Sequence, residues 1–527
     1  MITVKRFNSL IVLFSFTSFI SIALFLSCKN YHRNSKYPNV SLSSIAAGEK
    51  LSTKYCQSCH ALPDPSLLDT ESWEKGVLPN MGPRLGIFEF GFEVYPSLKN
   101  DRNLDASFYP TQPLLTPKQW QDILDYYVAT SPDSLPNQNR EQQIRNNLSL
   151  FSVLVPSFSY YNPTTSFVKI ISNDTLHPVL ISDVLKQKMY FFKSNLQLAD
   201  SIPVSGPVVD VDVTGKQMLA CNAGILNPNN GKSGKGQFIN INNIQTQQDE
   251  NLLFDSLQRP VQITSADLNN DGKNDYIICE FGYLTGALIW MENAGNNKFT
   301  KHVLRPWPGA IKAYVADYNK DGLLDIWVLF AQGEEGIFLY TNKGNGNFEQ
   351  EEVLRFPPSN GSSYFEFADF NNDGYPDIVY TCGDNADYSP VLKPYHGVYI
   401  FMNDKANHFT QKSFFPINGC YKAIARDFDN DGDLDIATIS FFADYARQPE
   451  EGFVYLENQG NYKFRPFSIP ETQAGRWLTM DAGDVNGDGK IDLVLGNFSM
   501  GTGIKKPKKD WKHGPAFMIL QNMGKNH

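Results

Sequence analysis

From about residue 150 onward, the chain alternates short apolar runs with turns rich in Asp, Asn and Gly. The run Ile289–Asn293 leads through a glycine turn to a second run ending at Phe299, and Phe338–Asn342 leads in the same way to Phe348. Short apolar runs bounded by turn residues are typical of buried strands. Because strand, turn and strand return at a regular period, we expect each period to form an antiparallel sheet of about four strands.

The region before residue 135 has a helical pattern instead. Residues 46–55 read as one short helix, and residues 116–128 read as a second. Thr116 is a favourable N-cap, and Pro117 suits the first helical position. Four apolar side chains of the second helix fall on one face: Trp120, Ile123, Leu124 and Tyr127.

Five segments of the repeats share a nine-residue pattern, and their starts are 50, 52, 58 and 57 residues apart. Oxygen-bearing side chains occupy positions 1, 3, 5 and 9 around a Gly at position 6. A tight turn lined by hard oxygen ligands suits Ca²⁺, so we expect about five calcium ions. The candidate ligands are Asp267, Asn269, Asp271 and Asp275; Asp317, Asn319, Asp321 and Asp325; Asp369, Asn371, Asp373 and Asp377; Asp427, Asp429, Asp431 and Asp435; and Asp484, Asn486, Asp488 and Asp492.

An EF-hand is the main rival interpretation of these loops, and it requires a Glu at position 12. That position instead holds strand-like residues, namely Ile278, Val328, Tyr380, Thr438 and Leu495. The loops therefore join strands rather than helices. Turns of the same composition without metal remain the alternative.

The number of sheets follows from two weaker copies of the period. Residues 209–215 look like a degenerate loop that begins at Asp210, 57 residues before Asp267, and one more period fits between residues 150 and 205. The repeats resemble the FG-GAP/VCBS family, and this resemblance implies an integrin-type β-propeller over residues 145–527. We expect seven blades, five of them with calcium loops, and an early strand such as residues 150–155 completing the last blade to close the ring.

The N-terminus is typical of an export signal. Lys5 and Arg6 precede an apolar run over residues 10–26, and the sequence then resembles a lipobox ending at Cys28. We expect residues 1–27 to be a signal peptide, Cys28 to be lipidated, and residues 28–42 to form a polar tether to a membrane. This predicts an exported protein, periplasmic or anchored to the outer membrane. A plain signal peptide or an uncleaved anchor helix is the alternative.

Cys56-Gln57-Ser58-Cys59-His60 is a C-x-x-C-H motif, in which two thiols reach the vinyl groups of one haem and the His supplies its proximal nitrogen. A redox C-x-x-C would need a βαβ context, and a zinc half-site would need a second ligand pair. The motif and its flanking helices resemble the cytochrome c family. The resemblance implies a small all-α haem c domain over residues 43–135, so the chain is expected to be multidomain.

Met81 is the candidate sixth ligand of the iron. It lies 21 residues after His60 in a segment that reads as an irregular loop, and no other Met lies between the haem motif and the propeller. Met and His ligation together raise the reduction potential and leave no open site for oxygen chemistry. A Met that only packs beside a five-coordinate iron is the alternative.

The net charge and the long loops limit the kinds of partner that this protein is expected to bind. The formal net charge is −10, and the one dense group of Lys residues, 505–512, is typical of a solvated loop, so we expect no nucleic acid partner. Three unusually long loops, at residues 382–396, 441–447 and 497–513, each follow the same strand of their blades. They should gather on one face, where they form either a site for a glycan or small molecule or simple loop packing.

These features favour an electron-transfer protein with an unidentified redox partner and a propeller for docking or ligand binding. Two alternatives remain open: a haem-linked dehydrogenase acting on a substrate bound to the propeller, and an adhesion or glycan-binding lipoprotein. Whether the protein is an enzyme stays undecided, although nothing in the sequence favours a hydrolase, and fold analogy does not choose among these functions.

Overall fold

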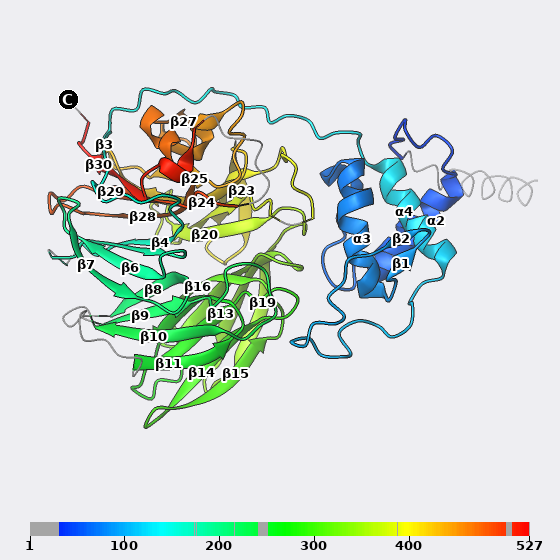
Figure 1. The fold of residues 1–527 in the computed structure, drawn as a ribbon, viewed down its shortest axis with the longest axis horizontal. Coiled ribbons are helices and arrows are strands. Elements are labelled where there is room, and N and C mark those ends of the chain that lie inside the picture. Colours follow the sequence, from blue (N-terminus) through cyan, green and yellow to red (C-terminus); the bar gives the residue numbers. More distant parts are fainter. Residues whose placement is uncertain are drawn as a thin grey trace, which may run out of the picture.

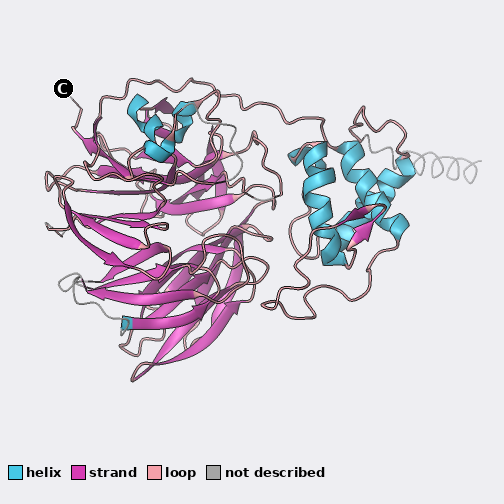
Figure 2. Cartoon of the chain, viewed as in Figure 1, coloured by secondary structure: helices cyan, strands magenta, loops and turns pink. Residues whose placement is uncertain are grey.

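The computed structural model describes residues 31–525 except 173, 175, 215–216, 241–250, 387 and 502–508. Among these residues, the strands after residue 150 form seven four-stranded antiparallel sheets, which confirms the predicted seven-bladed propeller. The sheets are arranged around a ring, and the helices of the N-terminal part gather at one side of it (Figures 1 and 2).

The order of strands within each sheet runs from the inner to the outer strand. The first four sheets are β4 (Thr165–Ile170), β5 (Val179–Asp183), β6 (Lys188–Phe192) and β7 (Leu198–Pro203); β8 (Val208–Thr214), β9 (Gln217–Asn222), β10 (Gly234–Asn240) and β11 (Leu252–Leu257); β12 (Pro260–Ala266), β13 (Asp275–Glu280), β14 (Ala287–Gly295) and β15 (Lys298–Arg305); and β16 (Ala310–Ala316), β17 (Asp325–Phe330), β18 (Gly336–Asn342) and β19 (Phe348–Arg355). The other three are β20 (Ser362–Ala368), β21 (Asp377–Cys382), β22 (Gly397–Asn403) and β23 (Phe409–Pro416); β24 (Cys420–Arg426), β25 (Asp435–Ser440), β26 (Phe453–Asn458) and β27 (Phe464–Phe467); and β28 (Trp477–Gly483), β29 (Asp492–Asn497), β30 (Phe517–Asn522) and β3 (Phe151–Leu154).

The last blade closes the ring with a strand from the start of the propeller. β3 pairs antiparallel with β30 in a register that matches Phe151 with Asn522 and Leu154 with Ile519. Leu150 and Phe151 pack into the hydrophobic cluster of this blade beside Trp477. The predicted closing strand is therefore confirmed, and the two ends of the propeller are held together by main-chain hydrogen bonds.

Side chains of the inner strands bind the main chain of the neighbouring blade. In each case a backbone N–H of one inner strand donates to a side-chain oxygen of another. These bonds run from Ile170 to Asp481 (2.9 Å), from Ser265 to Asp212 (2.9 Å), from Ala313 to Gln262 (2.6 Å) and from Ala425 to Glu366 (2.5 Å). Buried polar groups near the axis are thus satisfied across blade boundaries, which fixes the blades relative to one another.

The N-terminal part, which we call the helical region (residues 31–135), has its own hydrophobic cluster. Its helices are α2 (Leu42–Tyr55), a short 3₁₀ turn η1 (Pro65–Leu67), a continuous run of η2 (Ser72–Val77), α3 (Leu78–Met81) and η3 (Gly82–Leu85), and α4 (Pro117–Thr130). Thr116 caps α4 in a capping box with Gln119, as its sequence predicts. A two-stranded hairpin of β1 (Glu89–Phe90) and β2 (Glu93–Val94) was not expected, so this region is not purely helical.

The helices α2 and α4 cross at very short distance. A Cβ added at Gly48 would lie 1.9 Å from the carbonyl oxygen of Asp122, so the crossing requires a glycine in α2. Ser44, one turn earlier, donates from its Oγ to the carboxylates of Asp122 and Asp125. Both predicted helices are confirmed, and each is longer than its predicted range.

The segment predicted as a tether is partly folded. Asn34 is buried, and its backbone N–H donates to the carbonyl oxygen of Ala129 at 2.8 Å. The Tyr31 hydroxyl donates to Glu49 Oε2 at 2.7 Å. From Tyr31 onward, this segment packs on the helical region. Cys28 and the predicted signal peptide lie outside the described residues, and among those that are described no helix is long and apolar enough to cross a membrane.

The linker between the helical region and β3 is fixed along the propeller (Figure 1). Gln138 Nε2 donates to the carbonyl oxygen of His396 at 2.7 Å, and Arg140 Nε donates to that of Pro416 at 2.7 Å. Arg140 also forms a buried ion pair with Glu451, whose side chain has no exposed surface. These contacts hold the linker against the propeller and so restrict the orientation of the helical region relative to it.

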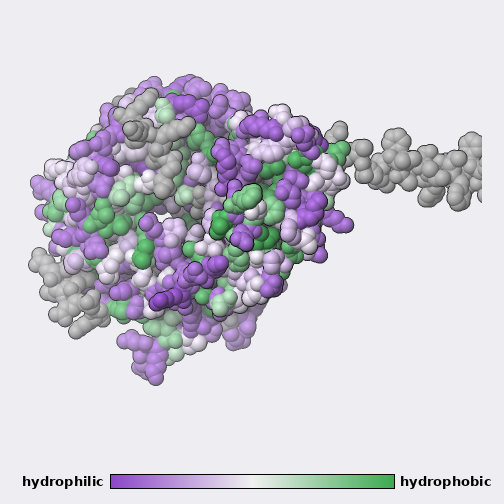
Figure 3. Space-filling model, turned by 45° about the vertical axis from the view of Figure 1, so that its right-hand side comes forward, coloured by the Kyte–Doolittle hydropathy of each residue, from purple (hydrophilic) through white to green (hydrophobic). Residues whose placement is uncertain are grey.

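The helical region contacts one edge of the propeller. Tyr395, in the loop after β21, donates its hydroxyl to the carbonyl oxygen of Leu67 at 3.0 Å. A Cβ added at Gly76 would lie 2.1 Å from the carbonyl oxygen of Tyr388, so these two main chains touch. Asn230, in the loop after β9, donates to Asp101 at 2.9 Å. The face seen in Figure 3 is mostly hydrophilic, with hydrophobic residues in small groups.

Replacing Arg140 with Ala should leave Glu451 buried without a counter-charge. We expect the free energy of unfolding to fall by about 3–5 kcal/mol, as is typical when one partner of a buried ion pair is removed. Urea denaturation of the full chain measures this difference.

Arg145→Ala is the matched control, because Arg145 lies on the same linker and is exposed. Its effect should stay within about 0.5 kcal/mol, which is usual for surface substitutions. Equal losses in the two variants would contradict the assignment of the Arg140–Glu451 pair.

Candidate functional site

The C-x-x-C-H motif lies on the turn that ends α2. The backbone N–H of Cys56 donates to the Ser52 carbonyl oxygen at 2.8 Å, and that of Cys59 donates to Cys56 at 3.4 Å. Both cysteines are free thiols, with Cys56 partly buried and Cys59 exposed. Burial raises the pKa of Cys56 to about 11. The raised pKa of Cys56 is the opposite of the lowered pKa that a reactive redox thiolate needs.

His60 is oriented by a hydrogen bond to the next residue. Its Nδ1 lies 2.8 Å from the carbonyl oxygen of Ala61. A carbonyl oxygen only accepts, so Nδ1 carries the proton and the lone pair of the neutral ring is on Nε2. Burial lowers the pKa of His60, which favours this neutral form. Attachment of a haem c requires two thiols three positions apart and an imidazole at the position after the second thiol. Cys56, Cys59 and His60 provide these groups, so the residues fit a haem c.

Met81 is the last residue of α3 rather than part of an irregular loop. The expectation of a loop was wrong because the π-turn η2 and the 3₁₀ turn η3 extend one continuous helical run through two prolines. Trp73 and Leu78 of this run pack in the same hydrophobic cluster as Tyr55, the residue before Cys56. The fold thus brings the Met81 helix and the end of α2 to one cluster, although they are distant in sequence.

All five Asp-rich loops have the predicted position between the first and second strands of a blade. Each repeats the same two bonds: the position 1 carboxylate accepts the N–H of the position 6 glycine, and the first oxygen of position 9 accepts an N–H from the third strand. In the first loop these bonds run from Gly272 to Asp267 (2.9 Å) and from Asn293 to Asp275 (2.7 Å). Positions 4 and 6 both have positive φ. A positive φ favours glycine, and Gly occupies position 6 in all five loops.

The position 9 carboxylates are buried in every loop. These are Asp275, Asp325, Asp377, Asp435 and Asp492, each at most 1% exposed. Burial raises the pKa of all five, and for Asp435 to about 7. In the fourth loop, oxygens of Asp427, Asp429 and Asp435 lie within 4.8 Å of one another. Carboxylates held this close repel one another unless they are protonated or share a cation, and several oxygen donors in one tight loop are a donor set that fits Ca²⁺.

Lys525 adds a cation to the fourth loop that sequence spacing did not indicate. Its Nζ forms ion pairs with Asp429 and, at 3.3 and 3.5 Å, with Asp431 and Glu457. Lys525 follows β30 of the neighbouring blade. Only the arrangement of the two blades brings it to this loop, since almost one hundred residues separate them in the chain.

Residues 209–214 of the predicted degenerate loop lie in a strand, and residue 215 lies outside the described residues. Asp210 and Asp212 lie inside β8, which continues to Thr214, and β9 begins at Gln217. Asp212 links two neighbouring blades, because its Oδ2 accepts a hydrogen bond from the hydroxyl of Ser265 at 2.7 Å. The alternating Val and Asp residues belong to an inner strand, and the similarity to the Asp spacing of the calcium loops was misleading.

The three long loops share one edge of the propeller, as predicted. They connect β21 to β22, β25 to β26 and β29 to β30, and an antiparallel blade places these connections opposite the Asp-rich loops. A cavity of about 280 Å³ lies where the first two loops meet the linker, lined by polar groups that include Lys393, Asn418, Arg447 and Gln448. His396 is completely buried, and burial holds its pKa well below the usual range.

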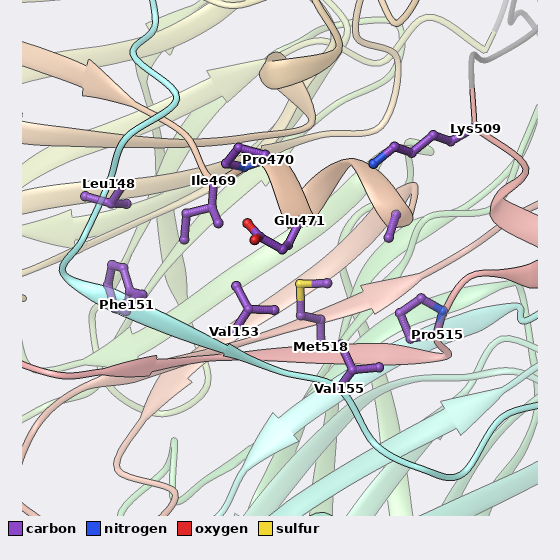
Figure 4. A pocket seen from close by; sticks show the side chains of 11 residues that line it. Leu148, Phe151, Val153, Val155, Ile469, Pro470, Glu471, Lys509, Pro515 and Met518 are labelled. Carbon is purple, nitrogen blue, oxygen red and sulfur yellow. The ribbon is translucent and has the colours of Figure 1, made fainter.

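A second cavity, of about 730 Å³, lies away from all the predicted site residues. It opens between β3 and the 3₁₀ turn η7 (Pro470–Ala474), and apolar side chains line most of it (Figure 4). Phe151 and Val153 of the closing strand form one wall, while Glu471 and Lys509 supply the charges. The described residues that line this cavity include no cluster of nucleophilic or metal-binding groups.

The four cysteines of the propeller are buried free thiols: Cys221, Cys279, Cys382 and Cys420. Burial raises the pKa of each, and for Cys279 and Cys420 to about 12. They act as small apolar residues at or near the ends of strands.

Comparisons with known proteins address the propeller. The model of the FG-GAP-like repeat family matches residues 267–328 and 317–380. The chain is 24% identical over 258 residues to the T-cell immunomodulatory protein homolog of Plasmodium falciparum, covering 44% of this chain and 36% of that protein. It is 24% identical over 347 residues to mouse cartilage acidic protein 1, covering 58% and 50%. The chain thus spans half or less of the length of these relatives.

Among solved structures, the chain is similar to BBS1N, crystallised in complex with ARL6DN, with a TM-score of 0.43 and 11% identity over 73% of this chain and 99% of that one. The match to the family model and the seven four-stranded sheets agree with each other. The chain therefore contains FG-GAP-like repeats within a seven-bladed β-propeller.

Proposed function

We propose that this protein transfers electrons through a haem c held covalently by Cys56 and Cys59, with His60 as the proximal ligand. The turn at the end of α2 carries the proposal, because two free thiols are followed directly by an imidazole whose Nδ1 is already bonded to Ala61. When bound, such a haem supplies a one-electron couple. The Ala61 carbonyl holds the ring so that Nε2 is available, a hydrogen bond that also makes the nitrogen more basic.

Met81 is our candidate for the second axial ligand. It is the last residue of α3, in the helical run that shares a hydrophobic cluster with Tyr55 at the end of α2, and a thioether there would complete a His/Met pair. If His60 and Met81 both held the iron, small oxidants would have no binding site, which would favour electron transfer over oxygen chemistry. The nearby charges of Arg355 and Glu334 shift the His60 pKa in opposite directions, so propeller residues lie within electrostatic reach of this site.

We also propose that the five Asp-rich loops bind Ca²⁺ and stabilise the propeller. The side chains at positions 1, 3, 5 and 9 would hold the ions, and the buried position 9 carboxylates support this role. These loops lie on the edge opposite the helical region, so we assign them to stability rather than to electron transfer.

Export and lipidation at Cys28 remain a proposal from the sequence. Tyr31, which already contacts the helical region, is three positions after Cys28. That length spans at most about 11 Å, so a lipid at Cys28 would hold the haem site close to a membrane. The redox partner would then meet the helical region near that membrane.

A haem-linked dehydrogenase is the second candidate function. The cavity of about 280 Å³ on the edge that faces the helical region favours it, because polar donors there suit a hydroxylated substrate. Reduction of the haem by a polyol without any partner protein would move the assignment to this function. An adhesion role would require glycan binding by a Cys56→Ala, Cys59→Ala variant.

Met81→Ala should change the iron from low-spin to high-spin while the haem stays attached. Absorption spectra of the ferric and ferrous protein, produced with c-type maturation enzymes, measure this change. Met402→Ala is a control, because Met402 lies in the propeller. A low-spin Met81→Ala variant would exclude Met81, and a wild type without covalent haem would exclude the haem proposal itself.

Removal of calcium with EGTA should lower the melting temperature of the full chain. Each site contributes about 2.7 kcal/mol when free calcium is one hundred times its dissociation constant. Asp427→Asn should remove part of this calcium dependence, because every loop has Asp at position 1, whereas Asp404→Asn, an exposed acid outside the Asp-rich loops, should leave it unchanged. Identical melting curves in excess EGTA and in calcium would contradict the proposal.

A further inference from the structure

Arg476 is a buried arginine that has no carboxylate partner among the described residues. Its side chain is completely buried just before β28. Nε donates to the carbonyl oxygen of Phe441 at 2.9 Å, and Nη1 donates to that of Met500 at 2.8 Å. Nη2 is buried and has no hydrogen-bond partner in the part of the chain that the structure describes. The guanidinium charge is therefore not neutralised by any acidic side chain there.

Other buried arginines of this protein are paired differently. Arg140 is paired with Glu451, and Arg305 with Glu334. A buried charge without a counter-ion costs several kcal/mol, and such groups are rarely retained without a function. Phe441 compensates in part, since its ring centre lies 3.5 Å from the guanidinium carbon. An aromatic ring, however, provides no oxygen acceptor for the unpaired N–H groups and offsets only part of the positive charge.

Arg476 lies between two of the three long loops. Phe441 and Phe442 come from the loop after β25, and Met500 and Gly501 come from the loop after β29. Met500 and Gly501 are exposed residues, and the Met500 carbonyl lies against Nη1 of the guanidinium. A Cβ added at Gly501 would lie 2.4 Å from Nη1, and its φ of +136° is a conformation that favours glycine. Among the described residues, one carbonyl hydrogen bond, from Nη1 to Met500, joins the Arg476 side chain to the loop after β29.

We propose that Arg476 binds the carboxylate of an acidic small molecule or acidic sugar, which replaces the Met500 carbonyl as acceptor. The two oxygens of a carboxylate match Nη1 and Nη2, and charge-assisted bonds are stronger than a bond to a neutral carbonyl. One guanidinium neutralises one negative charge, which favours a carboxylate over a doubly charged phosphate. The rings of Phe441 and Phe442 would contact the carbon skeleton of the ligand. This site does not depend on the haem or on the calcium loops.

The test compares sodium acetate and sodium glucuronate with sodium chloride at equal ionic strength and saturating calcium. We expect at least one carboxylate to raise the melting temperature of the full-length wild type in a saturable way, with binding also visible by calorimetry. Binding of acetate would indicate that any free carboxylate suffices, whereas binding of glucuronate alone would indicate an acidic sugar.

Arg476→Met should weaken this binding at least tenfold. Arg476→Lys should also weaken it, because lysine lacks the paired Nη1 and Nη2 donors of the guanidinium. Arg465→Met is the matched control, since Arg465 is partly exposed, is paired with Glu457 and lines neither cavity; it should bind like the wild type. Without ligand, Arg476→Met should melt no lower than the wild type, because an unpaired charge leaves the interior.

The proposal would be overturned if both carboxylates act on the wild type only as chloride does. A structural role would then be the explanation, and Arg476→Met would melt at a lower temperature because the bonds to Phe441 and Met500 are lost. Since the wild type is measured by itself, this outcome is decisive even if a variant does not fold.

Discussion

The pairing of β3 with β30 is the contact on which the rest of the structure depends. It joins residues near position 150 to residues near 520, so the ring closes without an open strand edge between its two ends. Closure also sets the path of the linker, because the chain must reach β3 after leaving α4. The linker crosses the propeller on the way and is held there by Arg140 and Gln138. The helical region is consequently placed against the edge that carries the long loops.

Four-stranded antiparallel blades divide the propeller into two edges with different chemistry. The turns between first and second strands hold the Asp-rich loops, where backbone N–H groups already satisfy part of each carboxylate. The connections between second and third strands are long and variable, and they hold Tyr395, Phe441 and Met500. This division follows from strand alternation alone. It separates a proposed stabilising role on one edge from contacts with the helical region and ligands on the other.

Buried charges show where the fold is complete and where it needs a partner. Glu451 has an arginine, and Asp481 and Glu366 accept bonds from neighbouring blades, so these groups are satisfied by the protein itself. The position 9 carboxylates are buried close to other acids, and Arg476 has no acid beside it within the described ranges. Low dielectric surroundings make such imbalances costly. A cation at the loops and an anion at Arg476 are the simplest ways to remove them.

The sequence by itself determined the features that depend on local spacing: the repeat period, the Asp-rich loops, the strand that closes the ring, the helices that became α2 and α4, and the C-x-x-C-H turn. It failed where a local pattern had two meanings. Asp210 and Asp212 imitate a calcium loop but lie inside β8, and prolines suggested a loop at Met81 although a π-turn continues the helix. Only the tertiary structure decided the contact of the helical region with the long loops, the approach of Lys525 to Asp429, and the isolation of Arg476. Periodicity reports which side of an element is buried, whereas the partners of a buried charge come from segments that the closed ring brings together across hundreds of residues.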